Sequence, residues 1–188
     1  MSTSTLVEIR WHGRGGQGAV TSAELLAKAA IDEGKYAQAF PSFGPERRGA
    51  PVLAFDRIDE KEQIRVRAGI TEPDAVVVLD SSLLGIVDFT EGLKEGGTIV
   101  MNTKKSLDDV AAEFSDKWKL AVVDATGIAR ELLGVNIVNT TMLGALLKAT
   151  GVVKLESLHE PLNKRFGRLA ERNINAMEKA FKDTTVKE

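Results

Sequence analysis

Four glycines within six residues constrain the fold of this chain more than any other feature. They belong to the run Gly13, Arg14, Gly15, Gly16, Gln17 and Gly18, which we call the glycine loop. Apolar and polar residues alternate over residues 6–12, which predicts a strand, and apolar residues recur at helical spacing from Ala19 to Glu33. A G-x-G-x-x-G spacing between a strand and a helix permits a tight turn and points backbone N–H groups at the positive end of the helix dipole. The first part of the chain is therefore predicted to have an α/β fold.

The glycine loop does not complete either of the common nucleotide-binding motifs. The second predicted strand, Tyr36–Phe40, ends without the acidic residue that holds a ribose hydroxyl in dinucleotide-binding proteins. Ala19 and Val20 follow the loop where a Walker A motif requires Lys and Ser or Thr. Two interpretations stay open: the loop binds a phosphate-bearing ligand or an anionic group of a partner, or it only packs helix against sheet.

The remaining apolar pattern predicts one α/β domain that spans residues 1–188. Short, continuous apolar runs predict strands buried on both faces at residues 75–79, 98–101 and 120–123. Helical spacing predicts three later helices, at residues 140–150, 155–166 and 170–182, with Pro161 shortening or kinking the second. We expect a mostly parallel, doubly wound sheet with helices on both faces.

We also expect an antiparallel hairpin in the middle of the chain. Residues 52–58 and 63–67 have the alternation of two paired strands, with a turn between them. One face of this hairpin would carry Arg57, Arg65 and Arg67. We interpret it as a solvated face, with an oligomer contact as the alternative.

A proline-rich segment supplies a second candidate binding element. Residues 41–51 hold three of the five prolines together with Arg47 and Arg48, which predicts a long irregular loop. In a doubly wound sheet this loop and the glycine loop leave their strands at the same edge. Because guanidinium groups recognise phosphate and carboxylate, we predict a shared anionic ligand. Surface ion pairs with Glu46 or contacts between subunits are the alternative.

Three more polar residues each close a predicted parallel strand. Asp80, Asn102 and Asp124 are expected at the carboxyl edge of the sheet, where open α/β folds bind ligands. Equally, the two aspartates turn the chain into the next helix. His12 ends the first strand without a partner that would make it a base, so we interpret it as structural. The sequence yields no catalytic residue and no metal site.

Composition excludes several classes of function. The chain has no cysteine, so disulfides, thiol nucleophiles and thiolate ligation of an iron–sulfur cluster are excluded for this chain. The 25 basic and 27 acidic residues disfavour a polybasic nucleic-acid binder. No apolar run approaches the roughly 20 residues that span a bilayer, and the first residues do not resemble a secretory leader. We therefore expect a cytoplasmic protein that binds neither nucleic acid nor membrane.

Six segments together resemble one known family. They read EIRWHGRGGQGA at 8–19, AFPSFGPERRGAP at 39–51, RVR at 65–67, PDAVVVLD at 73–80, VVDAT at 122–126 and NTTMLGAL at 139–146. These segments resemble the gamma subunits of the 2-oxoacid:ferredoxin oxidoreductases. The form FGPERRGAP resembles the branch that acts on pyruvate, the pyruvate:ferredoxin oxidoreductases or pyruvate synthases.

The resemblance implies a subunit that is not catalytic alone. Such enzymes convert pyruvate, coenzyme A and oxidised ferredoxin into acetyl-CoA, carbon dioxide and reduced ferredoxin. The resemblance implies alpha, beta and delta subunits as partners, and places thiamine diphosphate and [4Fe–4S] clusters on partner subunits. It also implies that coenzyme A could contact the glycine loop, Arg47 and Arg48. The alternatives are the same role for another 2-oxoacid, a free-standing nucleotide-binding protein, or a pure interaction module.

Overall fold

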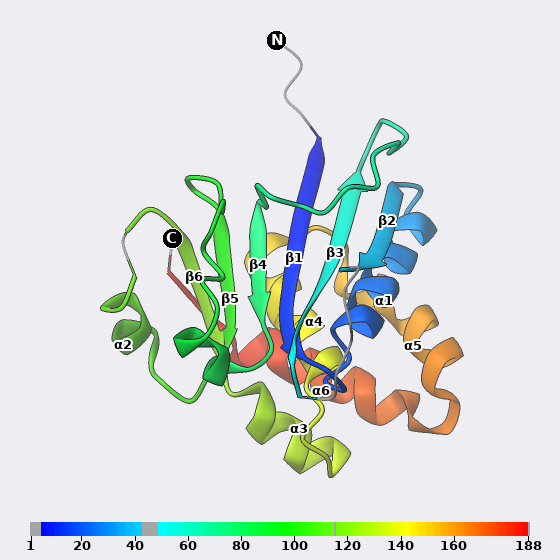
Figure 1. The fold of residues 1–188 in the computed structure, drawn as a ribbon. Helices are drawn as coiled ribbons and strands as arrows, with labels where there is room; N and C mark the ends of the chain where they lie inside the picture. The colour runs from blue at the N-terminus through cyan, green and yellow to red at the C-terminus, as the bar shows by residue number, and fades with distance from the viewer. Residues whose placement is uncertain (1–4, 43–48, 115, 188) are drawn as a thin grey trace.

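The computed structural model describes residues 5–42, 49–114 and 116–187. One sheet has seven strands in the order β2-β3-β1-β4-β5-β6-β7 (Figure 1). The strands are β1 (Leu6–Arg14), β2 (Tyr36–Pro41), β3 (Pro51–Asp59), β4 (Ala75–Val78), β5 (Thr98–Asn102), β6 (Lys119–Val123) and β7 (Thr185–Lys187). The α-helices are α1 (Ala19–Asp32), α2 (Leu107–Ala111), α3 (Ala125–Leu133), α4 (Asn139–Thr150), α5 (His159–Phe166) and α6 (Ala170–Asp183). Single 3₁₀ turns are η1 (Ser81–Gly85), η2 (Leu155–Leu158) and η3 (Gly167–Leu169).

The sheet confirms the predicted α/β class. Strands β1, β4, β5 and β6 pair in parallel, while β3 is antiparallel to both β1 and β2, and β7 is antiparallel to β6. Strands β1 and β2 therefore run in the same direction, as a strand–helix–strand unit requires, with β3 inserted between them. The chain order reverses between β1 and β4, and this reversal is the position where doubly wound sheets bind ligands.

The predicted hairpin is wrong in its second strand. Strand β3 forms, but it pairs along its full length with β1 and also with β2, so neither of its edges is free for residues 63–67. Those residues are irregular and cross the sheet beside β3 (Figure 1). Two side chains hold them: Arg57 donates to the Val66 carbonyl at 3.2 Å and Gln38 donates to the Ile64 carbonyl at 2.9 Å.

The expectation of a solvated arginine face is therefore wrong for Arg57. Its side chain is buried and pairs with Glu8 at 2.7 Å. Arg65 and Arg67 are exposed, as expected. Arg57 differs from Arg65 and Arg67 because residues 63–67 cover β3 and leave their own charged side chains in solvent.

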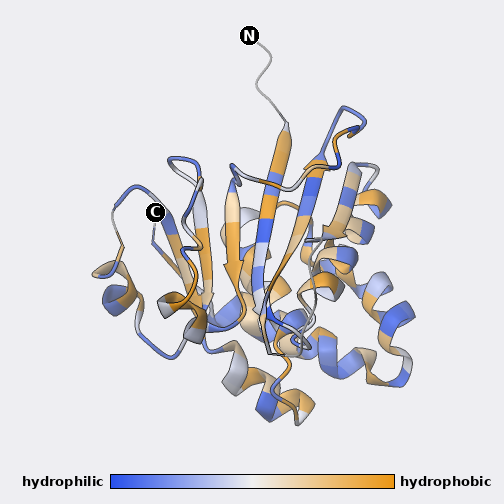
Figure 2. Ribbon diagram, viewed as in Figure 1, coloured by the Kyte–Doolittle hydropathy of each residue, from blue (hydrophilic) through white to orange (hydrophobic). Residues whose placement is uncertain are grey.

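Apolar clusters cover the two faces of the sheet. The larger cluster packs α1, α3, α4 and α6 against alternate residues of the strands, including Ile9 and Trp11 of β1. The smaller cluster joins the opposite side chains of β4, β5 and β6 to Phe89 and to Val110 of α2. Strand β4 is consequently apolar throughout, whereas β1 and β3 alternate (Figure 2). Helices on both faces were predicted, and this is confirmed.

The carboxyl group of Asp56, on β3, lies beside the larger apolar cluster. Asp56 is 0% exposed, and its Oδ2 accepts a hydrogen bond from Trp11 Nε1 at 2.7 Å. Its Oδ1 has no hydrogen-bond partner among the residues that the structure describes. Burial raises the pKa of Asp56 well above its usual value, and the hydrogen bond from Trp11 offsets only part of that rise.

Candidate functional site

The glycine loop connects β1 to α1 in a conformation that needs glycine. Gly16 and Gly18 have φ angles of 91° and 81°, in the left-handed region that other L-residues rarely adopt. Gly18 is the N-cap of α1 and provides no side-chain cap for the first turn. The turn is closed by two hydrogen bonds, from Gln17 N to the Arg14 carbonyl at 3.0 Å and from Arg14 N to Gln17 Oε1 at 2.7 Å. The loop predicted from the glycine spacing is confirmed as a tight strand-to-helix turn.

Asp80 joins the glycine loop to the end of β4 across the position where the chain order reverses. Its Oδ2 accepts from Gln17 Nε2 at 2.8 Å and from Arg14 Nε at 3.2 Å. Burial opposes ionisation of this carboxyl, but hydrogen bonds from Ser82 and Gln17 and the charge of Arg14 outweigh it and lower the pKa of Asp80. Asp80 is therefore a carboxylate that fixes the loop.

The Arg14 guanidinium is already occupied by protein groups. Besides Asp80, it donates to Ser82 Oγ at 2.9 Å and to the Gly49 carbonyl at 3.0 Å. Arg14 thus ties the glycine loop both to η1 and to the end of the proline-rich segment. Its contribution to ligand binding stays a prediction, and its observed contacts are those of a positioning residue.

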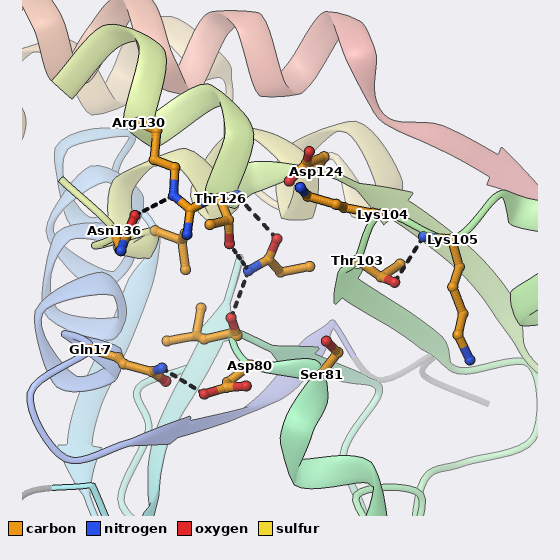
Figure 3. Close-up of a pocket in the computed structure, with 13 residues that line it drawn as sticks. Gln17, Asp80, Ser81, Thr103, Lys104, Lys105, Asp124, Thr126, Arg130 and Asn136 are labelled. Carbon is orange, nitrogen blue, oxygen red and sulfur yellow. Dashed lines mark hydrogen bonds between the residues drawn. The ribbon is translucent and has the colours of Figure 1, made fainter. Parts of the chain in front are cut away.

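A cavity of about 530 Å³ opens at the carboxyl ends of β4, β5 and β6 (Figure 3). We call it the strand-end cavity. It is lined by Gln17, Leu79, Asp80, Ser81, Asn102, Thr103, Lys104, Lys105, Asp124, Thr126, Arg130, Asn136 and Val138. Its size falls in the range of small-molecule sites. The structure therefore brings one residue of the glycine loop and all three predicted strand-end residues to one cavity.

The structural interpretation of the two strand-end aspartates is confirmed, and ligand binding at this edge stays a prediction. Asp80 accepts from the Ser82 N–H at 2.9 Å and Asp124 accepts from the Gly127 N–H at 2.8 Å, so each caps the helix or turn that follows. Asn102 donates to the Leu79 carbonyl and to Thr126 Oγ1, both at 2.9 Å. These residues line the cavity while holding its walls in place.

The cavity also carries cations that sequence reasoning missed. Lys104 lies at its exposed rim and makes no ion pair within the described part of the chain. Lys105 is paired with Glu113, and Arg130 Nε donates to Asn136 Oδ1 at 2.5 Å. The signal in the sequence is the lysine pair at 104–105, which follows the predicted strand 98–101 after two intervening residues.

Arg47 and Arg48 lie outside the described residues, so their prediction stays open. The residues that follow them are placed: Gly49 N donates to the Gly15 carbonyl at 3.2 Å, and Gly15 N donates to the Ala50 carbonyl at 2.9 Å. The proline-rich segment therefore re-enters the sheet against the glycine loop.

His12 faces away from the strand-end cavity, on the side of the smaller apolar cluster. Its Nε2 accepts a hydrogen bond from Arg10 Nε at 3.0 Å, and its ring meets that of Phe89 edge-on. Burial and the neighbouring Arg10 charge lower the pKa of His12 to about 3, so the ring is neutral at physiological pH. The structural interpretation of His12 is confirmed.

Metal clusters and membrane-spanning helices are two further features to consider in the described residues. No three His, Cys, Asp or Glu side chains there are grouped as a metal ion would require. No helix in the described ranges is long and apolar enough to cross a membrane.

A comparison with known families decides the membership of this chain. Residues 8–182 match the family model described as pyruvate ferredoxin/flavodoxin oxidoreductase. The chain belongs to this family. The match includes the glycine loop and every residue of the strand-end cavity.

Members of the family resemble the chain along its whole length. The Pyruvate/ketoisovalerate oxidoreductases common subunit gamma of Thermococcus kodakarensis is 60% identical over 185 residues, which cover 97% of this chain and 100% of the relative. The Pyruvate synthase subunit PorC of Methanocaldococcus jannaschii is 51% identical, covering 95% of this chain and 97% of the relative. A crystal structure of pyruvate oxidoreductase subunit PORC from Thermotoga maritima has a TM-score of 0.85 at 39% identity, covering 98% and 99% of the two chains.

Proposed function

We propose that this chain is the gamma subunit of a multi-chain pyruvate:ferredoxin oxidoreductase. That enzyme converts pyruvate, coenzyme A and oxidised ferredoxin into acetyl-CoA, carbon dioxide and reduced ferredoxin. The observation that carries the proposal is the end-to-end identity to a gamma subunit, 60% over 97% of the chain. In this assembly the alpha, beta and delta subunits are the partners, and ferredoxin is reached through the complex.

The redox and carbon chemistry belongs to those partners. A [4Fe–4S] cluster needs thiolate ligands, and this chain has no cysteine to provide them. The proposal likewise assigns thiamine diphosphate to the partner subunits. Within the described residues, His12 is buried and neutral and Asp80 is committed to the glycine loop. The chain acts by binding and positioning, and alone it is inactive.

The strand-end cavity and the glycine loop are the proposed contact for coenzyme A. Coenzyme A carries three phosphate groups, and the start of α1 presents backbone N–H groups with the positive end of its dipole. Lys104 at the cavity rim adds a positive charge that forms no ion pair within the described residues, although Asp80 and Asp124 line the same cavity. Arg47 and Arg48 precede Gly49, which is bonded to the loop, and we propose that they complete the anion site.

A second candidate function concerns the choice of 2-oxoacid. The T. kodakarensis relative is named as a subunit common to pyruvate and ketoisovalerate oxidoreductases. By analogy, the same chain would serve two enzymes that differ in their catalytic subunits. Isolation of the native chain distinguishes a subunit shared by two enzymes from a subunit of one enzyme. A shared subunit would be recovered with two different sets of catalytic subunits.

Native, anaerobic purification followed by mass spectrometry tests the subunit assignment. We expect three companion chains, iron–sulfur absorbance and reduction of a viologen dye that depends on pyruvate. A colourless, active particle that contains only this chain would refute the assignment.

Kinetics of the assembled enzyme test the coenzyme A contact. We expect Lys104→Ala, and Arg47→Ala with Arg48→Ala, to raise KM for coenzyme A several-fold and leave KM for pyruvate unchanged. Lys61→Ala is the matched control, because Lys61 is exposed beyond the end of β3, at the opposite edge of the sheet. Unchanged KM for coenzyme A in both variants would contradict the proposed contact.

A further inference from the structure

Strand β2 has an outer edge with which no described strand pairs. The sheet order places β2 at one end, with β3 on its inner side only (Figure 1). None of its six residues is buried, whereas every residue of β4 and β5 is. A strand in this position presents unpaired backbone N–H and C=O groups along one side. The outer edge of β2 is therefore open to pairing with another chain.

The inner side of β2 uses alternate residues for its bonds to β3. Ser42 N, directly beyond the end of the strand, donates to the Leu53 carbonyl at 2.9 Å. In an antiparallel pair every second residue exchanges bonds with the same neighbour, so Gln38 and Phe40 also point their backbone groups at β3. The residues between them point their N–H and C=O groups away from the sheet.

Ala37 and Ala39 carry these outward backbone groups. No described residue donates to them or accepts from them on that side. Their side chains are small and pack against the larger apolar cluster, so they do not obstruct a strand that approaches the edge. Pro41, two residues further on, has no N–H, so the edge that can donate ends there.

The side chains of β2 do not protect this edge. Edge strands are commonly kept from pairing by charged side chains, but residues 36–41 read YAQAFP and carry no charge. Tyr36, at the start of the strand, is 45% exposed. The strand at the other end of the sheet, β7, has only three residues and ends on Lys187. The outer edge of β2 is therefore the better of the two for the addition of a partner strand.

A cavity of about 320 Å³ adjoins the same edge, and we call it the edge cavity. It is lined by Gln38, Ala39, Phe40 and Arg67, and by no residue of β3. Gln38 Nε2 donates to the Ile64 carbonyl, whereas Gln38 Oε1 is buried without a hydrogen-bond partner among the described residues. An acceptor left in this way costs free energy that a donor brought into the cavity would recover. The edge cavity thus has the place and the chemistry to receive a side chain of an added strand.

Arg67 gives the edge cavity a positive charge that no side chain there balances. No Asp or Glu lines the cavity. Arg67 is exposed and makes no ion pair or hydrogen bond within the described residues, whereas Arg57 on the neighbouring strand is paired with Glu8. A carboxylate is the natural partner of such a guanidinium. A second copy that paired through its own β2 would not supply one, because residues 36–41 contain no Asp or Glu.

We propose that the outer edge of β2 binds an extended strand of a companion chain that carries a carboxylate side chain beside Arg67. Ala37 and Ala39 provide the backbone N–H and C=O groups that bond to this strand. Because side chains alternate between the faces of a sheet, the carboxylate lies on the face that carries Gln38 and Phe40. The companion chain belongs to the proposed assembly, so the occupant rests on the proposed function, whereas the open edge does not.

Hydrogen exchange, measured residue by residue in the free chain and in the natively purified assembly, tests the proposal. We expect the Ala37 and Ala39 amides to exchange at least a hundredfold more slowly in the assembly than in the free chain. The Gln38 and Phe40 amides, which point at β3, should be protected in both samples. If the companion chains are present and the two alanine amides still exchange as in the free chain, this proposal is overturned and the proposed function stands.

Two variants of the chain test how the strand is held in the assembly. Ala39→Pro removes one outward N–H and no bond to β3, so the free chain should fold while the Ala37 amide loses its protection in the assembly. Arg67→Glu reverses the charge of the edge cavity and should speed exchange at both alanines at least tenfold. Arg65→Glu is the matched control, because Arg65 is an exposed arginine of the same segment that does not line the edge cavity. Equal exchange in the two glutamate variants would overturn the pairing with a carboxylate.

Dilution of the free chain distinguishes a companion chain from a second copy. We expect the Ala37 and Ala39 amides of the free chain to exchange fast at every protein concentration. Slow exchange that is lost on dilution, together with a dimer in analytical ultracentrifugation, would assign the edge to a second copy and overturn the proposal.

Discussion

The buried carboxyl of Asp56 predicts an unusual dependence of stability on pH. Because its pKa is raised well above the usual value in the folded chain, the carboxyl holds a proton there that it releases on unfolding. The unfolded chain therefore binds fewer protons above about pH 4, and the free energy of unfolding falls as pH rises toward the native pKa. The contribution of this one group falls by about 1.4 kcal/mol for each pH unit in that window.

The substitution Asp56→Asn isolates this contribution. Asparagine keeps the shape of the side chain and an oxygen that accepts from Trp11 Nε1, but it has no carboxyl to ionise. We expect the stability of the variant relative to the unaltered chain to increase by about 1.4 kcal/mol per unit from about pH 5 upward, and to level off at the native pKa of Asp56. Denaturant unfolding of the full chain, at half-unit steps of pH, measures the difference.

The exposed residue Asp32, at the end of α1, provides the control. Asp32→Asn changes a carboxylate of the same type without burial, so its stability difference should show no comparable slope above pH 5. Parallel stability curves for Asp56→Asn and the unaltered chain between pH 5 and pH 8 would refute the argument, because they would mean that Asp56 is ionised in the folded state.

Three further predictions concern packing and ion pairs. Gly144→Ala places a Cβ 2.0 Å from the Met177 carbonyl oxygen where α4 crosses α6, so we expect a loss of at least about 2 kcal/mol in denaturant unfolding. Arg57→Met removes the buried guanidinium that pairs with the partly buried Glu8 carboxylate, while Lys94 stays 4.0 Å from the other Glu8 oxygen. We expect a loss of about 2 kcal/mol, most of it recovered by adding Glu8→Gln; additive losses would contradict this coupling. Arg14→Ala frees the Gly49 carbonyl, and we expect faster hydrogen exchange at the flanking amides while the amides of β4 stay protected.

Local pattern was sufficient for the elements that lie around the site. The glycine spacing predicted a turn between β1 and α1 because glycine adopts the left-handed angles seen at Gly16 and Gly18 without the steric cost that other residues have. The apolar runs of β4, β5 and β6 were visible because strands covered on both faces lack alternation. Placing Asp80, Asn102 and Asp124 at one edge then followed from parallel order alone.

Pairing between distant strands was decided by the tertiary structure. The alternation at residues 63–67 is that of a strand, but β1 and β2 occupy both edges of β3, and a strand needs a free edge to pair. Arg57 is buried for the same reason: residues 63–67 cannot pair as a strand and instead lie over the side chain of Arg57 on β3. Strand β7, only three residues long, has no pattern of its own and exists because β6 offers it an open edge.

The sequence by itself determined the α/β class, the glycine turn and the family, because periodicity, backbone preference and a specific string of residues are local properties. Only the tertiary structure showed that Lys104 joins the strand-end cavity and that Arg67 meets Gln38 and Phe40 at the outer edge of β2. These residues come from elements separated along the chain. Their proximity depends on helix packing and strand order. Both are determined by how the whole chain buries its apolar surface, and not by any local segment.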